Sequence, residues 1–452
     1  MKLYILGLVV FGAVSSIAIR DTSSCSVILQ RREFRDLSSS EWSMVASTVT
    51  KMQNLGWFHW FAFIHVHFFN VIHFVPIFLP WHRRFILEFE NVAKYYSPSF
   101  SLPYFDPTLD FSNPSNSEFF SGTYMGSSVD PSTNCVTDGI QTGWIMTYPN
   151  SHCLNRQFTF TSDPNSPFYW ISPEVLYSTI QTSTDFRSFE TAIENGIHAT
   201  IHSTIGGDMS SRYSPNDFSF FLHHSNIDRL WSQWQNIDPS YAPQYFNDPG
   251  KPQVSLQDTI FGFPDVVQDV MALARNGLCY SYSDSRYTSI SSKRDISFFS
   301  SAVSASQIPN MSLSKTLNQE TLEKYFPKLD PNGSSVLNIK LPTKLSIKAS
   351  QVVSVVSSAS INSTVPATNS TSAMQAPATQ RQSLINSTAV IDTLQNIDPG
   401  LLEQVKMPYP SRLSVEFMEM HGFDQNIYNS LYSEMTKIVD VLNEQGYISP
   451  YI

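Results

Sequence analysis

Apolar residues recur at helical spacing in the early part of the chain. In residues 41–53 they fall along one face, with Ser40 as the expected N-cap, which predicts an amphipathic helix. Residues 57–74 are apolar all round, a pattern typical of a buried helix. Because the histidines and Asn70 inside that stretch would be costly in lipid, a soluble helical bundle is favoured over a membrane span.

The same pattern predicts further helices at residues 81–93, 183–205 and 217–235. Pro76 and Pro80 are expected to break the chain before the helix at 81–93, whose charged residues should be exposed or ion-paired. Those charged residues are Arg83, Arg84, Glu88 and Glu90.

Residues 97–170 are rich in proline, serine, asparagine and aromatics, which indicates long loops. The histidines considered next all fall on or beside four of the predicted helices. The expected fold is therefore mainly α, with a central four-helix bundle holding a dinuclear site, long irregular loops and few short strands.

Six histidines form two triplets along the chain. They are His65, His73 and His82, followed by His198, His202 and His224. Imidazoles in threes, with no acidic residue at ligand spacing, indicate a borderline transition metal in an open site, and two facing sites make a dinuclear centre. His198 and His202 are four residues apart and project from one helix face, and His224 closes the site from the next helix. The adjacent His223 is expected to support the site rather than bind the same metal.

The first triplet requires a break in its helix. His65 and His73 are eight residues apart, so they can share a metal only if the helix ends before His73, as Pro76 suggests. His59 and His67 do not fit this geometry, and we expect them to be ordinary core histidines.

The donor set also indicates which metal is bound. Di-iron bundles and dinuclear zinc hydrolases normally use bridging carboxylates, which neither triplet offers. An all-imidazole pair of sites suits two copper ions that cycle between oxidation states. A lone histidine pair at this spacing would more often be structural, but the second triplet favours the metal.

The net charge and the first twenty residues restrict the class of protein to which this chain can belong. The net charge is −10 with no long basic run, which argues against a nucleic-acid partner. Residues 1–20 resemble a signal peptide, so we expect secretion and no membrane association after its removal; an anchor is disfavoured because the apolar run is short. The expected division after residue 20 is a catalytic domain, an extension, a Ser/Thr-rich linker and a small helical tail, at 21–295, 296–344, 345–395 and 396–452.

Cysteines and sequons fit an exported glycoprotein. Cys25, Cys135, Cys153 and Cys279 suggest two disulfides, with three pairings open. Sequons cluster late in the chain, at Asn310, Asn332, Asn362, Asn369 and Asn386.

Beyond these patterns, residues 25–282 resemble the type 3 copper proteins, which are tyrosinases, catechol oxidases and hemocyanins. FLPWHRRF, with His73 nine residues before His82, resembles the first copper-site signature, and SPNDFSFFLHHSNIDRLW resembles the second. LPYFDPTLD resembles a further family segment, although Phe105 and Pro107 replace its usual tryptophans. CVTDG, HCLNRQF and CYSY resemble short secreted fungal members, and Arg32 is expected to pack on the closing Tyr280-x-Tyr282 motif.

The resemblance implies roles for individual residues. The six histidines of the two triplets would bind the coppers. Glu194 matches a glutamate that holds a water for deprotonating phenols, although helix solvation is its ordinary alternative. Ala199 stands where many monophenol-hydroxylating members carry asparagine, which argues against strong monophenolase activity. Asp228 is expected to steady its helix or a ligand, or else to form a plain surface salt bridge near Arg229.

The expected function is a secreted copper polyphenol oxidase that uses O2 to oxidise o-diphenols to o-quinones, with weaker monophenol hydroxylation and a role in melanin formation. The alternative is a hemocyanin-like protein that binds O2 reversibly. Lys293 and Arg294 are either a processing site that releases an inhibitory C-terminal segment or an exposed basic pair. The sequence leaves open whether the C-terminal residues cover the metal site.

Overall fold

The computed structural model describes residues 25–159, 167–283, 313–329, 406–449 and 451–452. Several expectations lie outside these residues and stay predictions. They concern the signal peptide, the Ser/Thr-rich linker, the five sequons and the Lys293–Arg294 pair.

The first predicted helix, α2, is present at Ser39–Asn54. Its N-cap is Ser38 and not Ser40. The Ser38 hydroxyl accepts a hydrogen bond from the backbone N–H of Glu41, whose carboxylate accepts one from the backbone N–H of Ser38. This reciprocal pair needs a three-residue spacing, which Ser40 does not have.

Helix α3, Trp57–Ile72, ends where the first histidine triplet requires. His73 is the C-cap and has extended backbone, with φ −116° and ψ 143°. The expectation that α3 is buried all round was wrong, because His59, Phe63 and His67 lie on a solvent-facing side and are exposed. His59 and His67 are therefore not core histidines.

In the described part of the chain, no single helix is both long and apolar enough to span a membrane. Helices α2 and α3 pass that test only as a pair bent by 75°.

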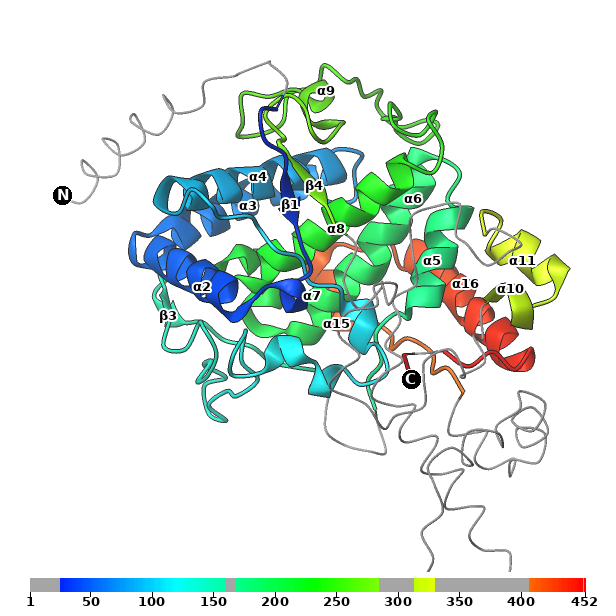
Figure 1. Cartoon of the computed structure of the whole chain (residues 1–452), viewed down its shortest axis with the longest axis horizontal. Helices are drawn as coiled ribbons and strands as arrows, with labels where there is room; N and C mark the ends of the chain where they lie inside the picture. Colours follow the sequence, from blue (N-terminus) through cyan, green and yellow to red (C-terminus); the bar gives the residue numbers. More distant parts are fainter. Residues whose placement is uncertain (1–24, 160–166, 284–312, 330–405, 450) are drawn as a thin grey trace, which may run out of the picture.

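Helix α4, Phe78–Tyr96, begins three residues earlier than expected. Pro80 lies inside its first turn, where the missing N–H is not needed, so only the Pro76 segment breaks the chain. Helix α4 packs against α8, Ser219–Gln235, in the centre of the molecule (Figure 1). Arg83 is fully buried between them and is not a surface charge.

The predicted helix at 183–205 consists of three consecutive segments. They are α6 (Phe186–Ile193), a π-helical turn (Glu194–His198) and α7 (Ala199–Ile205). Gly196 has non-helical dihedrals inside the π turn, which shifts the register before His198. A helix that was not predicted, α5 (Pro173–Thr182), precedes them and is capped by Ser172.

Short strands and two disulfides join distant loops. Strand β1 (Leu29–Arg31) pairs in parallel with β4 (Tyr280–Tyr282), and β2 (Ile145–Met146) pairs antiparallel with β3 (His152–Cys153). The disulfides are Cys25–Cys279 and Cys135–Cys153, so the pairing left open by the sequence is resolved. A further short helix, α9, covers Val267–Val270 and contacts α4.

The β1–β4 pair holds a buried charge network against the bundle. Arg31, and not Arg32, packs on the closing tyrosine pair: its guanidinium lies 3.5 Å from the Tyr280 ring centroid and donates to the Tyr282 hydroxyl at 2.9 Å. Strand alternation turns Arg31 inward, whereas Arg32 pairs with the half-exposed Glu41. This corrects the expectation for Arg32.

The carboxylate of Asp228 lies at the centre of this network. It accepts hydrogen bonds from the hydroxyls of Tyr280, at 2.7 Å, and Tyr282, at 2.6 Å, and pairs with Arg83. Glu90 pairs with Arg31 at 2.7 Å. Asp228 is thus buried and holds α8 to α4, and the alternative of a surface salt bridge is wrong; Arg229 pairs elsewhere.

The C-terminal residues belong to the same packed core. Helices α10 (Leu313–Thr316) and α11 (Gln319–Tyr325) lie near α5, and α16 (Gln425–Glu444) crosses α5 and the π turn (Figure 1). The short helix α15 (Val415–His421) precedes α16. Buried apolar side chains of α16 join the main hydrophobic cluster; they are Met435, Ile438, Val439 and Leu442.

Replacing Asp228 with asparagine should lower the free energy of unfolding by about 3–5 kcal/mol, because it leaves the buried guanidinium of Arg83 without its counter-charge. Urea unfolding followed by circular dichroism measures this. As a control, Glu434→Gln breaks an ion pair with Lys437 whose side chains are more than half exposed, and it should leave the curve unchanged. Equal effects of the two substitutions would contradict the role assigned to Asp228.

Glu174 predicts a pH dependence of stability. Burial raises the pKa of this carboxyl above its ordinary 4.5, and hydrogen bonds from Ser449 and Tyr447 offset the shift only in part. The folded state therefore holds this proton more tightly than the unfolded chain, so the contribution of Glu174 to stability falls as the pH rises above 4.5. Glu174→Gln should match the wild type in acid and gain in melting temperature relative to it as the pH rises. Parallel curves for the two proteins would overturn this.

Candidate metal centre

The fold brings both histidine triplets to one buried place. His65 lies on α3, His73 follows its last turn, and His82 lies one turn into α4. His198 ends the π turn, His202 lies on α7 and His224 on α8. All six side chains are at most 7% exposed.

In five of these six rings, a hydrogen bond fixes Nδ1. The Nδ1 atoms of His65, His82, His198 and His202 bond to backbone carbonyls, and that of His73 bonds to the Glu194 carboxylate at 2.9 Å. The accepting carbonyls belong to Arg212, Phe78, Glu194 and Met209 respectively. A neutral imidazole held in this way presents the lone pair of Nε2, which is the usual arrangement around a bound metal.

The Nε2 atoms are spaced as ligands of a shared ion. Those of His65 and His73 lie 3.2 Å apart, and those of His202 and His224 lie 3.3 Å apart. Nitrogens about 2.0–2.1 Å from one metal, at a near-tetrahedral angle, are separated by about 3.3 Å. The buried Nε2 atoms of His82 and His198 have no hydrogen-bond partner among the described residues, which is costly unless a metal fills that role.

The two triplets face each other. The rings of His82 and His224 stack at 4.3 Å with an interplanar angle of 11°, and the rings of His73 and His198 lie 5.7 Å apart. Two metals held by these triplets would therefore be neighbours. The residues present fit a dinuclear centre with imidazole ligands only.

His223 also lies close to the second triplet. A nitrogen of its ring falls within 4.8 Å of nitrogens of His198 and His202, so those three could also hold an ion. The stacking of His224 on His82, and the close approach of its Nε2 to that of His202, favour His224. The assignment of His224 as ligand and His223 as supporting residue stays a prediction, tested below.

Burial keeps these imidazoles neutral. It lowers the pKa of His65 to about 4 and that of His223 to about 3. In the other five predicted ligands burial lowers the pKa well below 6.5, and neighbouring imidazoles add to the shift; these are His73, His82, His198, His202 and His224. A neutral imidazole keeps the lone pair that a metal needs.

Glu194 is buried and tied to the first triplet. Besides its bond to His73, its carboxylate accepts hydrogen bonds from the backbone N–H of Phe74, at 3.0 and 2.9 Å. Burial, and then the nearby Glu190, raises the pKa of Glu194 well above 4.5. These contacts show that Glu194 orients His73 and is not a solvated helix residue; its proposed water-holding role stays a prediction.

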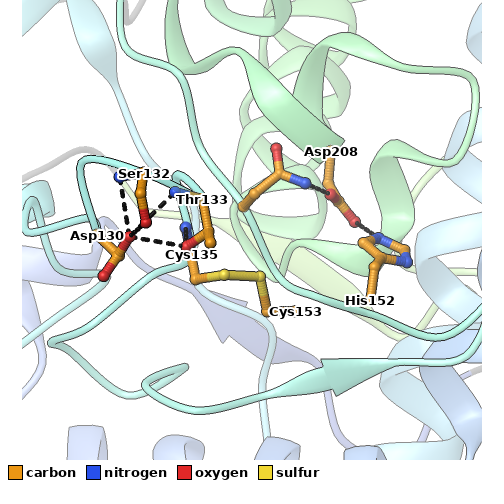
Figure 2. Close-up of a disulfide and its surroundings, with 8 residues drawn as sticks. Asp130, Ser132, Thr133, Cys135, His152, Cys153 and Asp208 are labelled. Carbon is orange, nitrogen blue, oxygen red and sulfur yellow. Dashed lines mark hydrogen bonds and ion pairs between the residues drawn. A yellow bond between two sulfur atoms is a disulfide. The ribbon is translucent and has the colours of Figure 1, made fainter.

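Two residues outside the helical bundle, His152 and Asp208, form a clamp that positions the backbone carbonyl bonded to His202. Figure 2 shows the Cys135–Cys153 disulfide beside His152, which points to Asp208. Nε2 of His152 lies 2.9 Å from the carboxylate of fully buried Asp208, and the next residue, Met209, supplies the carbonyl that accepts from Nδ1 of His202 at 2.7 Å. Sequence reasoning did not assign this clamp, although the HCLNRQF segment contains its histidine.

A small cavity of about 20 Å³ adjoins both triplets, and C-terminal residues form part of its wall. Phe417, His421 and Phe423 line it together with Ala199 and four of the predicted ligands. The question that the sequence left open is thus answered: the C-terminal residues cover the site. Only the aromatic content of the tail hinted at this, because nothing in the sequence places residue 417 beside residue 199.

Comparison with known proteins agrees with this geometry. Residues 50–237 match the family model described as the common central domain of tyrosinase. The tyrosinase of Streptomyces lincolnensis is 33% identical, over 38% of this chain and 67% of its own length. The tyrosinase-like protein phomQ1 of Diaporthe leptostromiformis is 29% identical, over 55% of this chain and 72% of its own length.

Among solved structures, a polyphenol oxidase mutant from Thermothelomyces thermophila is similar, with 23% identity, a TM-score of 0.48, and coverage of 57% of this chain and 89% of that one. The sequence relatives are decisive, because the bacterial tyrosinase exceeds 30% identity over two thirds of its length. The chain belongs to the tyrosinase family of type 3 copper proteins and is a dicopper oxidoreductase.

Proposed function

We propose that this enzyme uses O2 to oxidise o-diphenols to o-quinones, with weaker hydroxylation of monophenols. The observation that carries the proposal is the pair of facing imidazole triplets, whose Nε2 atoms are spaced as ligands and have no carboxylate between them. Each diphenol loses two electrons and two protons, and two diphenols together reduce one O2 to two water molecules.

Copper is the metal that this donor set favours. In the proposal, the first triplet holds one ion, and His198, His202 and His224 hold the other. Two copper ions, when bound, supply the redox chemistry that couples diphenol oxidation to O2 reduction. The chain itself keeps the ligands neutral, orients His73 through Glu194, and narrows the cavity beside them.

Ala199 supports the expected preference for diphenols. Its methyl group is buried, so the position after His198 offers neither a hydrogen-bond donor nor an acceptor to a water or a phenol. Glu194, the residue proposed to hold a water, has its oxygens engaged by His73 and Phe74. Both features argue for weak deprotonation of incoming monophenols.

The hemocyanin-like alternative draws on the same metal centre and is less supported, because the relatives reported above are named as tyrosinases or tyrosinase-like proteins. Secretion is also part of the proposal. Its support is the leader pattern of the sequence together with two disulfides, which persist in oxidising compartments.

Copper content should separate His224 from His223. After reconstitution with Cu(II), His224→Ala should fall from about two coppers per chain to about one, because it removes an inner ligand, whereas His223→Ala should keep both. Atomic absorption on gel-filtered protein measures this. The reverse result would make His223 the ligand and His224 its neighbour.

Oxygen uptake tests the reaction. The copper-loaded enzyme should consume O2 with catechol faster than with tyrosine, and the metal-free protein should consume none. Ala199→Asn should raise the ratio of the tyrosine rate to the catechol rate, since it restores a polar side chain beside His198. An absence of uptake with any phenol by the copper-loaded protein would overturn the proposed function.

A further inference from the structure

The cavity at the metal centre is partly covered by a segment distant in sequence. Phe417 and His421 on α15, and Phe423 just after it, complete a wall begun by Phe69 and Phe74. The rings of Phe423 and Phe74 lie 4.7 Å apart, and those of Phe417 and His421 lie 4.4 Å apart. The wall over the metal centre is therefore largely aromatic and comes from two ends of the chain.

The cavity as it stands is too small for any phenol. A volume of about 20 Å³ holds roughly one water molecule, whereas an aromatic ring is several times larger. Phenol entry therefore requires that some part of this wall moves. The α3 side carries predicted metal ligands and is fixed by the bundle, so α15 is the part that can move without disturbing them.

Helix α15 is attached firmly at both of its ends. Before it, Ser411 exchanges two hydrogen bonds of 2.9 Å with Tyr169, and Met407 exchanges two with the side chain of Asn443, at 2.8 and 2.9 Å. After it, α16 is part of the main core, and Tyr447 donates to buried Glu174. The chain is therefore packed into the fold both before and after α15.

Fewer polar contacts attach α15 itself to the rest of the protein. Nε2 of His421 lies 2.8 Å from the carbonyl of Ser210, and Arg212 reaches the carbonyl of Met420 at 3.5 Å. Its other attachment is apolar, through a cluster of Ala199, Leu413, Phe417, Met418 and Tyr428. A hinged motion would break these contacts and leave both attachments intact.

We infer that residues 413–423 are a substrate-selecting flap that stays with the enzyme, in which Phe417 and Phe423 limit the size of the phenol that reaches the metals. This inference rests on the proposed function for its substrate. It differs from a removable inhibitory segment, because cleavage before residue 313 would leave α16 packed in the core and α15 over the site.

The size limit is tested with two catechols. Phe423→Ala, at a half-buried position, should raise kcat/KM for 4-tert-butylcatechol by about tenfold relative to catechol, because it removes a ring from the entrance. Phe417→Leu should act in the same direction with less change in the fold. The control is Val415→Ala on the same helix, where the side chain is 51% exposed, and its ratio should not change. Equal ratios in all four proteins would overturn the assignment of these residues.

Amide hydrogen exchange tests the flap without relying on activity. In the full-length protein, amides of residues 413–423 should exchange faster than those of α16, since opening breaks only the flap contacts. If both segments exchange equally slowly, the flap is wrong, whatever the enzyme oxidises. If the flap opens but no phenol is oxidised, only the proposed function fails.

Cleavage distinguishes a permanent flap from a removable cover. A specific protease site placed at Lys293–Arg294 should, after cutting, yield two fragments that elute together in gel filtration, with an unchanged rate on catechol. Separation of the C-terminal fragment together with a rise in the catechol rate would show a removable inhibitor and would overturn the inference.

Discussion

The structure depends on one requirement: the buried imidazoles must be held at Nδ1 so that their Nε2 atoms are left for a metal. A polar atom without a partner in the core is costly, and this centre concentrates many of them. Five Nδ1 atoms are satisfied by carbonyls or a carboxylate from loops and helix turns, which leaves Nε2 atoms directed at one another. Only a metal, or a proton shared between paired nitrogens, can complete them.

That requirement accounts for irregular backbone around the site. α3 must stop before His73, so that His65 and His73 can meet although they lie eight residues apart. The π turn before His198 lets the carbonyl of Glu194 accept from the ring of His198. The turn at Met209 is held by Asp208, so that its carbonyl reaches His202. Each departure from regular structure serves one imidazole.

These facts explain what the sequence could and could not predict. The ligand spacing, the end of α3 and the all-imidazole donor set are local properties, so they could be predicted from the sequence alone. The inward turn of Arg31 in place of Arg32 depends on the β1–β4 register, which pairs residues about 250 apart. The exposure of His59 and His67 was missed because an apolar helix was taken to be buried on every side.

The choice of N-cap shows the same limit on a smaller scale. Ser38 and Ser40 are both suitable residue types, and only the reciprocal bond with Glu41 distinguishes them. The spacing of serine and glutamate would have indicated Ser38. Helix α5 was missed for a different reason, because its sequence directly follows a loop-rich region.

The residue after His198 connects the C-terminal segment to substrate choice. Ala199 is buried in a cluster with Phe417 and Met418, so its small size is required by packing as well as by chemistry. An asparagine there would have to displace the flap before it could reach a water or a phenol. In the proposed enzyme, the side chain at position 199 therefore affects both the packing of the C-terminal segment and the phenol that reaches the metals. In the proposed enzyme, substrate preference is therefore a joint property of the bundle, through Ala199, and of the flap that packs on it.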